Sequence, residues 1–236
     1  GSYNQAYQWN SKCYLLLQGM LNPVIQPVLV DLSGDRERQL NAFRKMVRFI
    51  AFLSFPLLFG LGMVSREFIV ITLTEKWLSS AEILRMLCIG GSVMPLYTLF
   101  SNVVITKGKS GIYFWCTVSL SVVQIALMLL LYPYGIHTMV CAYVALTIFW
   151  MFIWYGLSYR FIGYKPWDFF KDVCPFVLAA LGVMSVVYVV TMGIGNLPLL
   201  LLSRVVLAAG LYYVVMRIAK VKILDECLNF VLKRKK

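Results

Sequence analysis

The sequence predicts an all-α, polytopic membrane protein with about seven transmembrane helices. Hydrophobic residues make up 61% of the 236 positions, charged residues only 14%, and the mean hydropathy is +0.79. A soluble domain does not bury so large an apolar fraction. A hydrocarbon core of about 30 Å is crossed by roughly 20 apolar residues in a helix, and runs of that length recur along the chain. Lipid is therefore the main solvent of this chain.

Each apolar run is bounded by a cluster of charged residues, Gly or Pro. The runs are too long and too uniformly apolar for barrel strands, and backbone polar groups in lipid must pair within their own segment, so each run predicts a helix. In chain order the predicted spans are Tyr14 to Leu32, Val47 to Val64, Ile83 to Ile105, Ile112 to Leu131, Met139 to Leu157, Val173 to Ile194 and Leu197 to Met216.

The loops between the spans alternate between rich and poor in Lys and Arg, which predicts their orientation. Most of the 22 basic residues follow spans one, three, five and seven, whereas the opposite loops hold only Lys12, Arg66 and Lys76. The basic side is cytoplasmic by the positive-inside rule, so the chain begins outside and its C-terminus lies inside. The basic amphipathic tail, residues 223–236, is expected to lie on the inner leaflet.

Several functional classes are disfavoured by composition. The net charge of +12 resides in short loops beside the membrane rather than on one soluble face, which argues against a nucleic-acid partner. Six cysteines are scattered without metal-ligand spacing, and His137 is the only histidine. We therefore expect no metal site and no catalytic residues, and predict that the chain is not an enzyme.

The first span carries a polar stripe that a lipid-facing helix would lack. Residues four apart drift slowly round one face of a helix, and here five such positions are polar. Pro23 and Pro27 also remove two backbone donors from its inner half. We favour a cavity-lining role, the alternative being inter-helix hydrogen bonds of about 0.6 to 2 kcal/mol each. The stripe consists of Asn10, Tyr14, Gln18, Asn22 and Gln26.

Two arginines fall inside predicted spans. Arg85 lies near the outer end of span three, where an ion pair with Glu82 is expected because the two are three residues apart. Arg204 lies about 10 Å into the hydrocarbon, with no acidic residue on its helix. It must face protein, water or an anionic ligand. Lys12, at the outer mouth of the stripe, is either an interfacial anchor or an anion contact.

The first 110 residues contain several recognisable motifs. They are Gly1 to Trp9, Gln26 to Leu29, AFRKMVRFIAFLSFPLLFGLGMVSREFI from Ala42 to Ile69, Glu75 to Trp77, Leu87 to Gly91 and Thr106 to Ser110. These motifs resemble those of the polysaccharide flippase family, the Wzx-like lipopolysaccharide biosynthesis proteins. That family belongs to the multidrug/oligosaccharidyl-lipid/polysaccharide exporter superfamily. Residues 111 to 236 resemble it mainly in the number and orientation of their spans.

The resemblance implies the second lobe of a MATE-like transporter fold. Residues 1–165 would form part of the C-terminal six-helix lobe, with five of its spans present, and residues 166–222 two extra transmembrane helices. The N-terminal lobe of the same protein would be the missing partner. The family also implies a multi-pass protein of the bacterial inner membrane that binds membrane lipids.

By the same resemblance, the substrate is an undecaprenyl-diphosphate-linked oligosaccharide that is translocated by alternating access for surface polysaccharide synthesis. No cofactor is expected, while coupling to a Na⁺ or H⁺ gradient is left open. One alternative is a multidrug/cation antiporter of the same superfamily, and a less favoured one is a membrane-embedded polysaccharide polymerase or transferase. The candidate substrate-binding residues are Lys12, Gln18, Asn22, Gln26, Arg85 and Arg204.

Overall fold

A computed structural model of the chain describes residues 1–31, 35–221 and 223, although the side chains at 20–24, 26–28 and 30–31 lie outside that description. The described part is helical throughout and contains no strand, which confirms the predicted all-α class. Its helices are α1 (Ser2–Asp31), α2 (Arg36–Met63), α3 (Ser65–Leu73), α4 (Leu78–Thr106), α5 (Ser110–Leu131), α6 (Ile136–Ile162), α7 (Pro166–Val190) and α8 (Leu197–Ile218), with short 3₁₀ turns at Glu75–Trp77 and Tyr132–Tyr134.

Six segments of the described chain are long and apolar enough to cross a membrane, which makes this a multi-pass membrane protein. They correspond to α2, α4, α5, α6, α7 and α8, and so to predicted spans two to seven. The first predicted span falls within α1, where several side chains lie outside the described residues. The predicted tail, 223–236, lies outside them as well, apart from Ile223.

Helix ends differ from the predicted span ends where charged residues extend a helix beyond the hydrocarbon. α2 begins at Arg36 rather than near Val47, because Asp35 caps its first turn by accepting hydrogen bonds from the amides of Glu37 and Arg38 at 3.1 Å. The predicted outer loop before span three instead contains the short helix α3. α7 begins at Pro166, a residue well suited to a first helical turn.

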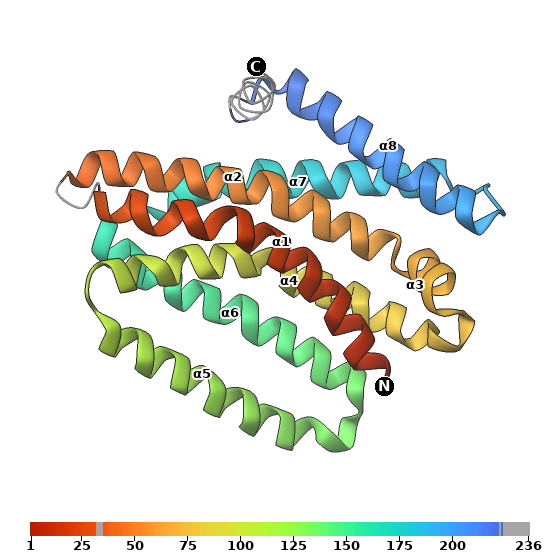
Figure 1. Cartoon of the computed structure of the whole chain (residues 1–236), viewed down its shortest axis with the longest axis horizontal. Helices are drawn as coiled ribbons and strands as arrows, with labels where there is room; N and C mark the ends of the chain where they lie inside the picture. Colours follow the sequence, from red (N-terminus) through yellow and green to blue (C-terminus); the bar gives the residue numbers. More distant parts are fainter. Residues whose placement is uncertain (32–34, 222, 224–236) are drawn as a thin grey trace.

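The helices lie nearly side by side, with α4 at the centre (Figure 1). α4 packs against α1, α2 and α6, while α7 packs against α2, and α8 packs against α7 and α3. α5 contacts α6 and α4 and has no buried residue. α2, α5 and α7 begin at one end of the bundle, whereas α4, α6 and α8 begin at the other. This alternation agrees with the predicted topology.

Polar contacts join three helix ends on the predicted inner side. Gln39 of α2 is almost fully buried, and its side-chain amide donates to the carbonyl of Leu29 in α1 at 2.7 Å. Its own carbonyl accepts from Lys107, just after α4, at 2.9 Å. A buried amide satisfied on both sides fixes the position of the helices that supply its partners.

Close approach of α1 to α4 depends on a glycine. A side chain at Gly91 would overlap the amide oxygen of the buried Asn10. Gly210 lies inside α8 with no atom near its hypothetical Cβ, so it provides a matched control.

We predict that Gly91→Ala lowers the free energy of unfolding by about 1 to 3 kcal/mol relative to Gly210→Ala. This is the cost of overpacking, because the gain in helix propensity, up to about 1 kcal/mol, is common to both changes and cancels in the comparison. Thermal unfolding of the purified protein in nanodiscs measures the difference. Equal stability of the two variants would contradict a tight contact between α1 and α4.

Candidate functional site

The polar stripe of α1 faces α4 in its described part. The Tyr14 hydroxyl lies 3.0 Å from the hydroxyl of Thr98, and the Gln18 amide donates to the same Thr98 oxygen at 2.8 Å. Gln18 also hydrogen-bonds Tyr14. These three side chains, all partly buried, form a chain of hydrogen bonds between two helices. Hydrogen bonds between helices are the alternative to a cavity-lining role for the stripe, and these side chains make them. Part of the Gln18 surface stays exposed.

The two ends of the stripe differ in how much the structure describes. Asn10 packs against Gly91, and its buried side-chain oxygen accepts no hydrogen bond from the described residues. The side chains of Asn22 and Gln26, two of the predicted glycan contacts, lie outside the described residues. The cavity-lining hypothesis for the inner half of the stripe therefore stays a prediction.

Arg204 is buried and faces protein. Its guanidinium lies 2.9 Å from the carboxylate of Glu67 in α3, and its Nε donates to the Thr191 hydroxyl at 3.1 Å. It also lies 4.9 Å from the ring centre of Tyr188. The exposed fractions of the Arg204 and Glu67 side chains are only 6% and 8%. The sequence predicts that Arg204 faces protein, water or an anionic ligand, and the structure shows that it faces protein.

The expected ion pair between Arg85 and Glu82 is wrong. Arg85 donates instead to the carbonyl of Gly62 at the end of α2, at 3.5 Å. Glu82 lies 3.8 Å from the His137 ring at the start of α6. Spacing along α4 places both residues on one side of that helix, but the neighbouring helix ends offer each a different partner.

Arg85, Arg66, Glu67 and Arg204 line one cavity of about 760 Å³ at the predicted outer end of the bundle. Lys12 is not part of it. Its ammonium group lies 4.0 Å from the ring centre of Trp9 on the same helix, a cation–π contact typical of an interfacial anchor. The structure thus brings together two of the predicted site residues, Arg85 and Arg204, and leaves Lys12 and Gln18 elsewhere.

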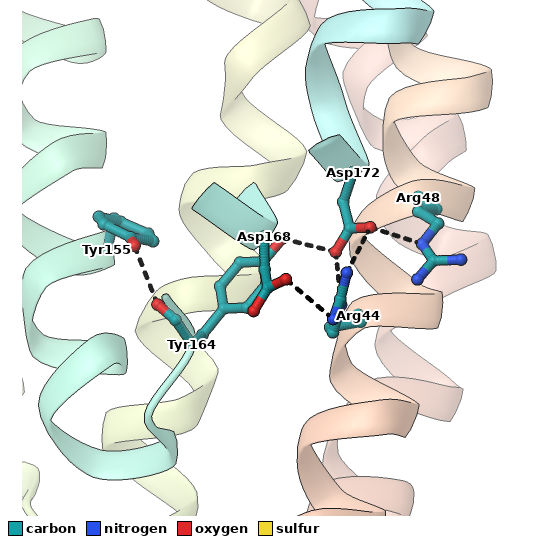
Figure 2. Close-up of polar contacts among 6 residues, drawn as sticks. All are labelled: Arg44, Arg48, Tyr155, Tyr164, Asp168 and Asp172. Carbon is teal, nitrogen blue, oxygen red and sulfur yellow. Dashed lines mark hydrogen bonds and ion pairs between the residues drawn. The ribbon is translucent and has the colours of Figure 1, made fainter. Parts of the chain in front are cut away.

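A second ionic cluster lies at the predicted inner end, where α2 meets α7 (Figure 2). Asp172 is 3% exposed and lies 2.8 Å from Arg44 and 2.7 Å from Arg48. Arg44 also reaches Asp168 at 3.1 Å. Two carboxylates and two guanidiniums balance their charges here, and this pairing offsets the cost of burying Asp172 away from water.

Tyr164 completes this cluster from the loop between α6 and α7. Its hydroxyl donates to Asp172 at 3.1 Å, while its carbonyl accepts from the Tyr155 hydroxyl at 2.9 Å. Burial and the neighbouring Asp172 carboxylate raise the pKa of the Tyr164 phenol, so it stays protonated and acts as a donor. The cluster therefore connects α6, α2 and the beginning of α7 (Figure 2).

The sequence analysis missed Asp172, Asp168 and Glu67. Arg44 and Arg48 are among the basic residues that follow predicted span one, and the structure places both in α2. One available signal is that the two arginines and the two aspartates each lie four residues apart, so each pair lies on one helix face. Among the described residues, no three His, Cys, Asp or Glu side chains gather into a group that could hold a metal ion.

Residues 1–82 match a family described as polysaccharide biosynthesis protein. The chain is 30% identical over 152 residues to the teichuronic acid biosynthesis protein TuaB of Bacillus subtilis (strain 168), a region that is 64% of this chain and 30% of that protein. It is 27% identical over 114 residues to the lipopolysaccharide biosynthesis protein WzxC of Escherichia coli (strain K12), which is 48% of this chain and 23% of that protein.

A third relative is an uncharacterized membrane protein in the cps region of Klebsiella pneumoniae, 27% identical over 109 residues, or 46% of this chain and 22% of that protein. The matched regions thus cover less than a third of each relative's own length. No solved structure matches the chain. These matches confirm the resemblance found in the sequence: the chain is similar to polysaccharide biosynthesis proteins, and its long apolar helices are those of a multi-pass membrane protein.

Proposed function

We propose that this chain is the C-terminal part of a flippase that exports polysaccharide precursors across the bacterial inner membrane. The observation that carries this proposal is the likeness to TuaB and WzxC, whose names place them in teichuronic acid and lipopolysaccharide biosynthesis. Six apolar helices support a transport role. The proposed substrate is an undecaprenyl-diphosphate-linked oligosaccharide, and the proposed partner is the N-terminal lobe of the same protein.

The proposed mechanism is alternating access, in which two lobes rock about a central site. α1 to α6 would form most of one lobe, and α7 and α8 would be the two extra helices. Such motion needs a lobe that moves as a unit. Hydrogen bonds from α4 to two neighbouring helices support such a unit. Thr98 of α4 accepts from Gln18 of α1, and the Phe100 carbonyl of α4 accepts from Ser158 of α6 at 3.1 Å.

Within this proposal, the stripe of α1 would contact the glycan through Gln18, Asn22 and Gln26. Amide side chains both donate and accept hydrogen bonds, which suits sugar hydroxyl groups. Arg204 is already neutralised by Glu67, which weakens its assignment as a contact for the diphosphate. Arg85 donates to the carbonyl of Gly62 and lines the outer cavity, to which no described residue of the stripe contributes, so it is not assigned to the diphosphate either.

We expect the triple change Gln18→Leu, Asn22→Leu and Gln26→Leu in the full-length protein to lower surface polysaccharide about tenfold or more. Loss of about 1.4 kcal/mol of substrate binding suffices for that factor, and each amide contributes about 0.6 to 2 kcal/mol. Immunoblotting or compositional analysis of the polysaccharide measures it, with protein abundance checked in parallel. Gln8→Leu, on the same helix but off the stripe, is the control.

A second variant separates substrate contact from helix packing. Thr98→Val removes the partner of Tyr14 and Gln18 on α4 but leaves the three amides in place. Retained export in this variant, with loss in the triple variant, supports glycan contact. Unaltered polysaccharide in the triple variant would refute the assignment.

The antiporter alternative gains no support from the acidic residues that the structure describes. A cation-coupled transporter needs an intramembrane carboxylate available to Na⁺ or H⁺. Among the described residues, the buried carboxylates are those of Glu67 and Asp172, and each is held by arginine. The flippase proposal is therefore favoured over the antiporter for this part of the protein.

A further inference from the structure

The cavity at the predicted outer end lies at a junction of helix ends. Its walls come from the end of α2, the start of α3, the first turns of α4, the end of α7 and the first turns of α8 (Figure 1). These helix ends lie near the predicted outer ends of spans two, three, six and seven, so the cavity opens at the level of lipid headgroups and reaches down to Arg204.

The cavity carries more positive than negative charge. Three arginines and two glutamates line it, and Arg204 and Glu67 neutralise each other. Arg66 is exposed and makes no hydrogen bond or ion pair with any described residue, and Arg85 contacts only a carbonyl. The remaining carboxylate, Glu82, is 71% exposed and lies next to His137. Two guanidiniums therefore remain without a carboxylate partner, and such groups favour phosphate.

An apolar groove of about 680 Å³ adjoins this cavity between α2 and α8. Met63 lines both spaces, and on α8 the cavity residues Leu200 and Arg204 alternate with the groove residues Leu201 and Val205. The groove continues along α8 to Tyr212, whose hydroxyl is already used by the carbonyl of Phe52 at 3.0 Å. Its lining is thus almost entirely apolar.

The length of the groove matches one leaflet. The path from Leu201 to Tyr212 rises about 16 Å along the α8 axis, close to half of a hydrocarbon core of about 30 Å. That is the depth of a phospholipid acyl chain. A cationic cavity at headgroup level, with an apolar groove one leaflet deep below it, is complementary to a lipid with an anionic head.

We propose that this cavity and groove bind one anionic phospholipid, with its phosphate at Arg66 and Arg85 and one acyl chain between α2 and α8. The lipid would fill the groove between α2 and α8. This binding site does not depend on the proposed transport activity, and its occupant is not the transported substrate.

The test uses native mass spectrometry of the full-length protein released from vesicles of phosphatidylglycerol mixed with phosphatidylcholine. Wild type is expected to retain phosphatidylglycerol preferentially. In Arg66→Gln/Arg85→Gln its affinity falls about 30-fold, since each surface guanidinium contributes about a fivefold factor. The variant Arg66→Lys/Arg85→Lys keeps the charge and most of the binding. Lys76→Gln, an exposed residue that does not line the cavity, leaves binding unaltered.

The groove has its own variant. Ala209→Trp adds a bulky side chain to an exposed groove position and is expected to reduce retention of either lipid. Equal retention of the two lipids by wild type, or binding that survives the double glutamine change, would overturn the proposal. So would displacement by glycerol 3-phosphate, which lacks a chain, or by undecaprenyl phosphate at an equal concentration, which would assign the site to an isoprenoid.

Discussion

Glu67→Gln is expected to destabilise the protein by about 3 to 5 kcal/mol. The change removes the carboxylate that neutralises Arg204, 2.9 Å away, in a place where both side chains are more than nine-tenths buried. A buried guanidinium without a counterion costs more than the pair itself contributes, because its desolvation is no longer offset. The contact links α8 to α3, so unfolding should begin with separation of these two elements.

Thermal or denaturant unfolding of the purified protein in nanodiscs measures this effect, with the exposed Glu75→Gln as a control for the loss of a carboxylate. The double change Glu67→Gln/Arg204→Met is expected to recover much of the stability, since an apolar replacement leaves no buried charge. A double variant as unstable as the single one would show that the ion pair is not the cause.

Asp172→Asn is expected to cost about 3 kcal/mol. The Asp172 carboxylate is the common partner of Arg44, Arg48 and Tyr164, and an amide cannot neutralise two guanidiniums. Part of the Arg48 side chain can turn toward water, because it is 43% exposed, which keeps the expected loss at the lower end of the range for buried pairs. α7 should loosen from α2 before the rest of the bundle unfolds.

Hydrogen exchange of α7 together with thermal unfolding tests this second prediction. Asp168→Asn provides the matched control on the same helix, because Asp168 is 25% exposed and pairs with Arg44. Its expected cost is below about 1 kcal/mol. Equal destabilisation by the two changes would mean that burial of Asp172 does not determine the strength of the cluster.

The fold could be predicted from the sequence because its strongest signal, hydropathy, is summed over the residues of one segment at a time. About 20 apolar residues identify a span whatever its neighbours are, and six such spans appear where they were predicted. The start of α2 at Arg36 could not be predicted in the same way. Hydropathy records neither the Asp35 cap nor the Asp172 partner that Arg44 and Arg48 find on α7.

The candidate sites depend more heavily on tertiary contacts. The depth of Arg204 in its span predicted that it needs a partner, but the partner, Glu67, belongs to a short helix that was predicted as a loop. Proximity along α4 suggested pairing of Arg85 with Glu82, whereas the ends of α2 and α6 provide other groups. A helical face can be derived from residue spacing, but the element that covers it cannot.

The equal spacing of charges on α2 and α7 has a mechanical consequence. Arg44 and Arg48 are one helical turn apart, as are Asp168 and Asp172. Sliding α7 along α2 by one turn, about 5.4 Å, would bring Asp168 to the place of Asp172 and preserve a carboxylate between the arginines. A shift of half that length would move both carboxylates about 2.7 Å from their present positions and lengthen their contacts with Arg44 and Arg48. The contact between α2 and α7 therefore resists gradual sliding and favours discrete registers of the α7–α8 pair.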